Sequence, residues 1–119
     1  MKRILLVDDS PLFYNFVRNV LKKENIEIEW AKNGREALRK IKEKKPELIL
    51  VDIILSDMNG VELIRKIRRD WEKAKIIVIT GVDKDYVAED AFEAGALDYL
   101  VKNLPLGEFK KKILKYLEN

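Results

Sequence analysis

The chain has 119 residues, of which 47% are hydrophobic and 38% charged, and this suits one globular domain with a single core. Its net charge of +3 comes from 24 basic and 21 acidic residues scattered along the chain, a mixture that argues against direct binding of nucleic acid. Cysteine and histidine are absent, which excludes disulfides, thiolate or imidazole metal sites, and catalysis by either side chain.

The first predicted element is a strand over residues 4–7, an uninterrupted apolar run that ends at Asp8 and Asp9. Because Lys2 and Arg3 precede it, this run resembles the start of a signal peptide, but it is too short for an h-region or a membrane span. We therefore expect a cytoplasmic protein that makes no contact with a membrane.

A helix is predicted next, because Ser10 is suited to an N-cap and Pro11 to the first helical position. Apolar residues at helical spacing extend this helix from residue 12 to about residue 24. Apolar and acidic residues then alternate over residues 26–30, which predicts an edge strand with one face in water. The stripe that we expect the helix to bury comprises Leu12, Phe13, Phe16, Val17, Val20 and Leu21.

The central strand is predicted over residues 48–51, where four apolar residues without alternation are typical of a strand buried on both faces of a parallel sheet. Before it, Asn33 and Gly34 mark a turn that opens a helix, and Pro46 follows the end of that helix. Asp52 comes directly after the strand, at the end where open α/β sheets place their ligands. The buried face of the helix comprises Ala37, Leu38 and Ile41.

The second half of the chain repeats this alternation. A helix begins beyond Gly60, and an uninterrupted apolar strand over residues 76–79 ends at Thr80. The next helix is closed by Gly95 in a left-handed cap, and a partly alternating edge strand over residues 97–101 precedes Lys102 and a last helix. We expect the three helices to bury Val61, Ile64 and Ile67; Val87, Ala91 and Phe92; and Leu106, Phe109, Ile113 and Leu117; and we expect Arg65, Lys66, Arg68 and Arg69 to face water.

Five strands that alternate with five helices predict an α/β fold with a doubly wound parallel sheet, in one domain over residues 1–119. The strands over residues 4–7, 48–51 and 76–79 are apolar throughout and should be central, while the other two alternate and should be edges. The strand order 2-1-3-4-5 meets both conditions. In this order the sheet has its switch point between the first and third strands, so we expect a crevice between Asp8-Asp9 and Asp52.

Three carboxylates in one crevice repel each other unless a cation joins them. Oxygen ligands without histidine or cysteine suit a hard divalent ion, and Mg²⁺ together with Lys102 balances Asp8, Asp9 and Asp52. A carboxylate beside Mg²⁺ and an ammonium can attack phosphorus, since aspartyl phosphates are an established intermediate. Lys102 and the Thr80 hydroxyl would then stabilise the phosphoryl oxygens.

The motifs form an ordered set that comprises Asp8-Asp9, residues 31–34 with Ala37-Leu38, Asp52 with Gly60, Thr80-Gly81, residues 92–100 and Lys102. This set resembles the receiver domains of two-component response regulators, which implies a flavodoxin-like sheet. The resemblance implies that a histidine kinase or phosphotransfer protein donates a phosphoryl group to Asp52. It also implies that Asp9, Asp52 and the backbone carbonyl of Ile54 hold Mg²⁺ directly, and that Asp8 assists through water.

The same resemblance implies a switch made by Thr80 and Tyr99. On phosphorylation the hydroxyl moves toward the phosphoryl group and the aromatic ring enters the space that it leaves. The surface formed by the last two helices and the strand over residues 97–101 then changes shape and binds a downstream protein or output domain. The domain is expected to be no enzyme in the ordinary sense, because it catalyses only its own phosphorylation and dephosphorylation.

Two positions differ from the family pattern, since Ser56 and Asn103 stand where these domains usually have proline. Ser56 predicts a less rigid loop after Asp52. At Asn103 we expect a trans peptide bond, because a cis bond before a residue other than proline costs about 2.5–4 kcal/mol, and we expect Pro105 in the first turn of the last helix. Ile54 and Val82 resemble family positions that control the approach of water to the acyl phosphate. Because both are apolar, we expect slow hydrolysis, and polar replacements at both should speed the decay.

Two alternatives remain open at this stage. One is a receiver-like interaction module that is not phosphorylated, which the residues at Ser56 and Asn103 motivate. The other is a phosphohydrolase with an aspartyl nucleophile, although the Asp-x-Asp-x-Thr signature of such enzymes is missing after the first strand. Asp57 is interpreted as an ordinary loop acid.

Overall fold

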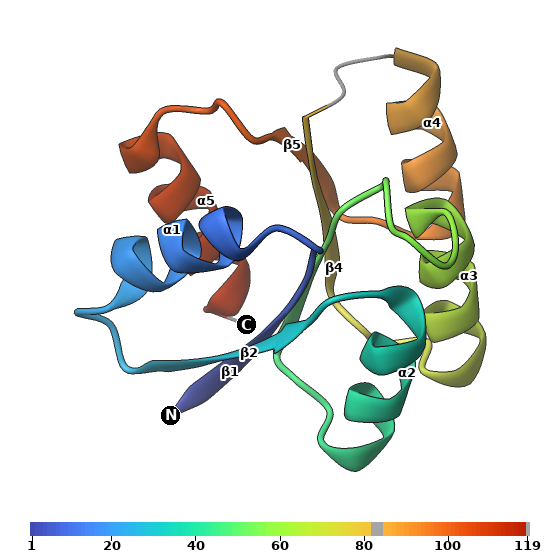
Figure 1. The fold of residues 1–119 in the computed structure, drawn as a ribbon, viewed down its shortest axis with the longest axis horizontal. Coiled ribbons are helices and arrows are strands. Elements are labelled where there is room, and N and C mark those ends of the chain that lie inside the picture. The colour runs from blue at the N-terminus through green and yellow to red at the C-terminus, as the bar shows by residue number, and fades with distance from the viewer. Residues whose placement is uncertain (82–84, 119) are drawn as a thin grey trace.

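The computed structural model describes residues 1–81 and 85–118. Val82, which was predicted with Ile54 to slow acyl-phosphate hydrolysis, lies outside these residues. Strands and helices alternate along the chain as the sequence predicts (Figure 1). They are β1 (Lys2–Val7), α1 (Pro11–Leu21), β2 (Ile26–Ala31), α2 (Gly34–Glu43), β3 (Leu48–Val51), α3 (Gly60–Asp70), β4 (Ile76–Thr80), α4 (Asp85–Ala94), β5 (Asp98–Val101) and α5 (Leu106–Leu117).

The five strands form one parallel sheet in the order β2-β1-β3-β4-β5, which confirms the predicted topology. The register of this sheet decides which strand ends meet. Val7 at the end of β1 pairs with Val51 at the end of β3, and the N–H of Asp52 donates to the carbonyl of Val7 at 2.9 Å. The residues that follow β1 and β3 therefore lie side by side.

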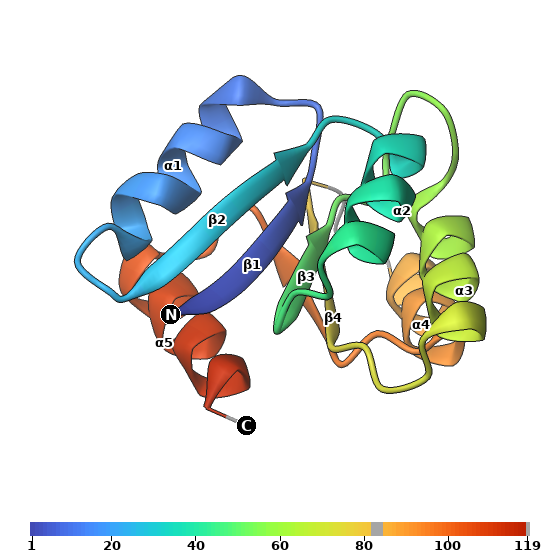
Figure 2. The ribbon, with the colours of Figure 1, turned by 90° about the horizontal axis from the view of Figure 1, so that it is seen from below.

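Helices cover both faces of the sheet: α1 and α5 lie on one face, and α2, α3 and α4 on the other (Figure 2). Successive residues of a strand point to opposite faces, so β3 supplies Leu48 and Leu50 to the α1 and α5 side and Ile49 and Val51 to the other. All four are fully buried, which is why this strand carries no polar residue.

The edge strand β2 differs from this pattern, because none of its residues except Ala31 is fully buried. The acidic side chains of β2 are not exposed to water alone, because they form ion pairs. The guanidinium of Arg3 on β1 contacts the carboxylates of Glu27 at 2.8 Å and Glu29 at 3.2 Å. The alternation therefore marks an edge, as predicted, and ion pairs cover part of it.

Three apolar side chains that were predicted to be buried are exposed: Leu12 at 82%, Phe92 at 48% and Leu106 at 56%. Leu12 and Leu106 lie in the first turns of their helices. Leu106 lines a shallow hollow between α1 and α5, and Leu12 lines another between α1 and Lys102. Phe92 follows the buried Ala91 and points away from the arc of α4 that meets the core. Helical spacing alone does not show where a helix extends past its sheet.

Arg68 was predicted to face water, and this is wrong. Its guanidinium donates to the backbone carbonyls of Ala74 and Gly95, each at 2.6 Å. Gly95 has a φ of +118°, in agreement with the predicted left-handed cap. The side chain of Arg68 thus joins the end of α3 to the turn that leads into β5.

Further differences lie at helix ends. Ser10 caps α1 as predicted, by accepting from the N–H of Phe13, but the helix ends at Leu21, earlier than expected. Pro105 takes the N-cap position of α5 and does not lie within its first turn. The bond before Asn103 is trans, as predicted, because residues 1–81 and 85–118 contain no cis peptide bond. Within the same described residues, no helix is long and apolar enough to span a bilayer.

Candidate functional site

The polar residues predicted at the ends of the strands lie together at one edge of the sheet. Asp8 and Asp9 follow β1, and Asp52 follows β3. One carboxylate oxygen from each of these three residues lies within 4.8 Å of the others. Asp8 and Asp52 are buried, whereas Asp9 is exposed. The arrangement follows from the register of β1 and β3, and it gathers negative charge in a largely desolvated place.

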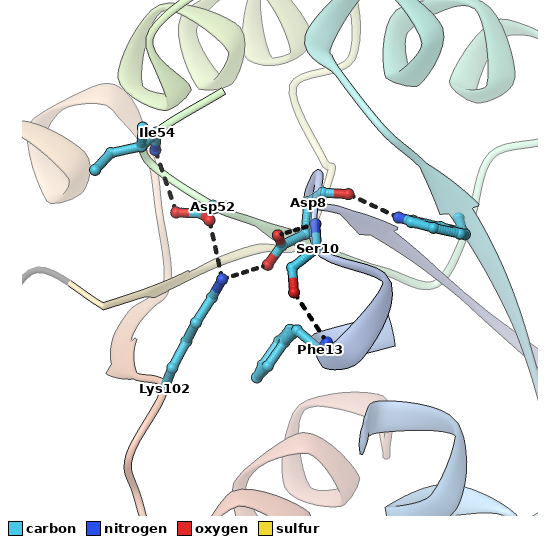
Figure 3. Close-up of polar contacts among 7 residues, drawn as sticks. Asp8, Ser10, Phe13, Asp52, Ile54 and Lys102 are labelled. Carbon is cyan, nitrogen blue, oxygen red and sulfur yellow. Dashed lines mark hydrogen bonds and ion pairs between the residues drawn. The ribbon is translucent and has the colours of Figure 1, made fainter. Parts of the chain in front are cut away.

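Lys102 brings a positive charge into this cluster from the end of β5. Its ammonium lies 2.7 Å from Asp8 Oδ2 and 3.1 Å from Asp52 Oδ2 (Figure 3). The same ammonium lies 4.8 Å from the centre of the Phe13 ring, close enough for a cation–π contact. Burial alone would lower the pKa of Lys102, but its hydrogen bond to Asp8 and the charge of Asp52 outweigh burial and raise it. Lys102 is therefore held as a cation.

The backbone also places Lys102. Its N–H donates to the carbonyl of Thr80 at 2.8 Å, in continuation of the β4–β5 ladder. Thr80 is fully buried at the end of β4, and Tyr99 is half-buried on the neighbouring strand, where it packs against the core on the α2, α3 and α4 side. Tyr99 pairs with Val78, two residues before Thr80, so Thr80 and Tyr99 are diagonal neighbours on one face of the sheet.

Asp8 is held on several sides. Its Oδ1 accepts a hydrogen bond from the N–H of Ser10 at 2.9 Å, and its Oδ2 forms the ion pair with Lys102. Its own N–H donates to the carbonyl of Ala31 on β2 at 3.0 Å. Asp8 is thus already occupied by donors of the protein, whereas the exposed Asp9 extends from the next position.

Asp52 lies at the centre of the cluster. Its Oδ1 accepts from the N–H of Ile54 at 3.2 Å, and its Oδ2 faces Lys102 (Figure 3). Burial raises the pKa of Asp52, and the charge of Asp8 adds to this effect, while the N–H of Ile54 and the ammonium of Lys102 oppose it. The pKa remains above its ordinary value, so the negative charge on Asp52 is only partly compensated.

These residues fit a hard divalent cation. The cluster offers carboxylate oxygens without nitrogen or sulfur ligands, which is the donor set of Mg²⁺ or Mn²⁺. Three carboxylates and one ammonium leave an excess of two negative charges, the amount that one divalent ion neutralises. The backbone of Ile54, the other predicted ligand, lies in the loop after Asp52 and pairs with Asn59.

The loop that contains Ile54 has a tie to α2 that the sequence interpretation missed. The carboxylate of Asp57 accepts from the N–H groups of Gly34 and Arg35, each at 2.9 Å, and Asn33 accepts from the N–H of Glu36. Burial would raise the pKa of Asp57, but the N–H donors of Gly34 and Arg35 outweigh it and hold the pKa below its ordinary value. The sequence contained one indication of this contact. It predicts the start of a helix after Asn33, and the free N–H groups at a helix start favour a nearby carboxylate.

The loop is also held at its far end. The N–H of Gly60 donates to the carbonyl of Ile53 at 2.7 Å. A Cβ at position 60 would come within 2.5 Å of the carbonyl oxygen of Asp52, so only glycine allows the first turn of α3 to approach the strand end. The loop around Ser56, predicted to be less rigid, is thus bound to α2 through Asp57 and closed by the hydrogen bond between Gly60 and Ile53.

Comparisons with known proteins agree with this arrangement. A family model described as the response regulator receiver domain matches residues 4–114. The chain is 37% identical over 102 residues to the chemotaxis protein CheY of Thermotoga maritima, and the alignment covers 85% of each chain. The BeF3-activated N-terminal receiver domain of Klebsiella pneumoniae RstA superposes with a TM-score of 0.93 at 28% identity, over 99% of this chain and 100% of that chain. The Mn(2+)-bound form of the response regulator Rcp1 gives a TM-score of 0.85 at 25% identity, over 100% and 96% of the two chains.

Replacement of the central carboxylate tests the charge balance of the cluster. We expect Asp52→Asn to raise the unfolding temperature in the presence of a chelator, because the amide removes a buried charge that repels Asp8. Circular dichroism on heating measures the effect. Asp70→Asn, at an exposed acid of α3, is the control and should leave the temperature nearly unchanged. A lower unfolding temperature for Asp52→Asn would show that the pair with Lys102 outweighs the repulsion.

A second prediction concerns the tie between the loop and α2. Asp57→Ala should lower the free energy of unfolding by about 1 kcal/mol near neutral pH, as for the loss of a helix N-cap. Because the folded-state pKa of Asp57 is lowered, this stabilisation is present above the ordinary aspartate pKa and is lost as the pH falls through the folded-state value. Urea titrations at neutral and acid pH, with Asp70→Ala as control, should show that the difference in unfolding free energy between Asp57→Ala and the wild type disappears in acid. An equal difference in unfolding free energy at neutral and acid pH would rule out a role for the charge of Asp57.

Proposed function

Because this chain belongs to the receiver domains of two-component response regulators, we propose that it is one phosphoacceptor domain over residues 1–119, in which Asp52 receives the phosphoryl group. The contact of the Lys102 ammonium with both Asp8 and Asp52 carries this proposal. It supplies a cation at the position where the phosphoryl oxygens would gather, next to a carboxylate whose charge is incompletely neutralised.

The cofactor proposed is Mg²⁺. Asp9, Asp52 and the backbone carbonyl of Ile54 would hold it, with Asp8 acting through water. The exposure of Asp9 and the donors already bound to Asp8 support this division. The Mn(2+)-bound form of the response regulator Rcp1, a structural relative, supports a divalent ion here. When bound, the ion would neutralise charge on the carboxylates and on the phosphoryl group.

In the proposed reaction an oxygen of Asp52 forms a bond to phosphorus while the bond from phosphorus to the donor's histidine nitrogen breaks. The electron pair of that bond stays on the imidazole, which takes up a proton. Lys102 stabilises the phosphoryl oxygens, and the hydroxyl of Thr80 donates a further hydrogen bond. The donor is a histidine kinase or phosphotransfer protein, and the domain turns over no other substrate.

The proposed readout runs from Thr80 to Tyr99. Thr80 would move toward the phosphoryl group and Tyr99 would enter the space behind it, which changes the surface of α4, β5 and α5. Their diagonal position on one face of the sheet supports this coupling. A downstream protein or an output domain would bind this surface. We place the domain in the cytoplasm, without direct contact to nucleic acid or a membrane.

Phosphorylation by a small donor tests the proposal. With acetyl phosphate and Mg²⁺, the intact protein should gain the mass of one phosphoryl group, because acyl phosphates can react without a partner kinase. Asp52→Asn should gain none, and a chelator should abolish the gain. The measurement is intact-protein mass spectrometry.

Asp57→Asn is the control, since Asp57 belongs to the adjacent loop and should not receive the phosphoryl group. A wild-type protein that binds Mg²⁺ but gains no mass would favour the unphosphorylated interaction module. Repeated release of phosphate from a stable ester would instead favour a phosphohydrolase.

The switch makes a separate prediction. In the wild-type protein, addition of BeF3⁻ and Mg²⁺ should shift the amide NMR resonances of α4, β5 and α5, because the anion takes the place of a phosphoryl group. Thr80→Val keeps a buried side chain of similar size but lacks the hydroxyl, so these shifts should be much smaller even when the site is saturated. Tyr14→Phe, on α1, should respond as the wild type does. Equal shifts in Thr80→Val would contradict the proposed coupling.

A further inference from the structure

A tryptophan of the edge strand contacts the acidic cluster through the backbone. The indole Nε1–H of Trp30 on β2 donates to the backbone carbonyl of Asp8 at 2.7 Å. The N–H of Asp8 donates in turn to the carbonyl of Ala31, the residue after Trp30. Both backbone polar groups of Asp8 are therefore bound by adjacent residues of β2, one of them through a side chain.

The indole ring has little freedom to leave this position. It stacks on the ring of Tyr14 with centroids 4.5 Å apart and planes 12° apart. The ammonium of Lys32 lies 5.2 Å from the indole centroid, and the guanidinium of Arg18 lies 5.5 Å from the Tyr14 centroid. The Tyr14 ring and the Lys32 ammonium thus contact the indole directly, and Arg18 contacts Tyr14 in turn.

The carbonyl that Trp30 holds is part of the peptide bond between Asp8 and Asp9. Since that peptide is planar, a hydrogen bond to its oxygen restricts the orientation of the whole unit, from which the exposed carboxylate of Asp9 extends. The buried carboxylate of Asp8 is restricted from the other side by Ser10 and Lys102. The contact of Trp30 therefore acts on the one acid of the cluster that lies at the surface.

We propose that Trp30 is a positioning residue for the divalent cation: through the Asp8 carbonyl it orients the Asp9 carboxylate and so sets the affinity of the site. This inference rests on the proposed function, which assigns a cation to the cluster. It predicts that Trp30 contributes to binding of the metal and not to the subsequent transfer of the phosphoryl group. It also makes the indole a spectroscopic reporter, because a change at Asp9 reaches the indole through one hydrogen bond.

Trp30→Phe tests the proposal, since phenylalanine retains an aromatic ring for the stack but has no N–H. Calorimetric titration with Mg²⁺ should show an affinity about 3- to 10-fold weaker than in the wild type, the effect of one neutral hydrogen bond. At saturating Mg²⁺, the rate of phosphorylation by acetyl phosphate should return to the wild-type value. Trp71→Phe, at the other tryptophan of the chain, is the matched control and should bind Mg²⁺ as the wild type does.

A role of Trp30 in stability alone would lower the unfolding temperature and leave the Mg²⁺ affinity unchanged, and this would overturn the proposal. The Trp71→Phe protein gives a second test without a change at Trp30. Its emission comes from Trp30 alone and should change during Mg²⁺ titration with the midpoint found by calorimetry, whereas constant emission would contradict the inference. A wild-type protein that binds no Mg²⁺ would instead remove the proposed metal site itself.

Discussion

Acidic groups held close together at one edge of a parallel sheet are the constraint on which this structure depends. The register that pairs Val7 with Val51 brings Asp8 and Asp52 together, and both are largely removed from water. Lys102, the residue after β5, contacts both carboxylates. Each part of the fold that fixes β1, β3 and β5 in this order therefore also fixes the distances within the cluster.

The order of the strands could be predicted because a strand that is buried on both faces has a different pattern of apolar residues from an edge strand. The residues of β3 and residues 76–79 of β4 are apolar without interruption, since helices cover both faces, whereas β2 alternates as edge strands do. The ends of the helices were less accessible to prediction. Leu12 and Leu106 fit a helical stripe, yet they lie in the first turns of their helices and are exposed. Periodicity does not show which turns of a helix lie outside the core.

Among the candidate site residues, those that directly follow strands could be placed from the topology alone, because parallel strands end at a common edge. The supporting contacts could not. Asp57 binds the start of α2 across 23 residues, and Trp30 binds the carbonyl of Asp8 across 22. Each joins a side chain to a distant backbone group, and such a contact leaves no periodic pattern. Arg68, which binds the carbonyl of Gly95, was misread as a surface charge for the same reason.

The ion pairs of Arg3 with Glu27 and Glu29 bear on how copies of this domain meet at high concentration. An open strand edge offers unpaired backbone groups to any similar strand. Two β2 edges that approached each other would bring their glutamates into proximity, and this repulsion adds to the cost of removing the ion pairs from water. The sheet thus carries its own protection against edge-to-edge aggregation, at the side farthest in the strand order from Lys102.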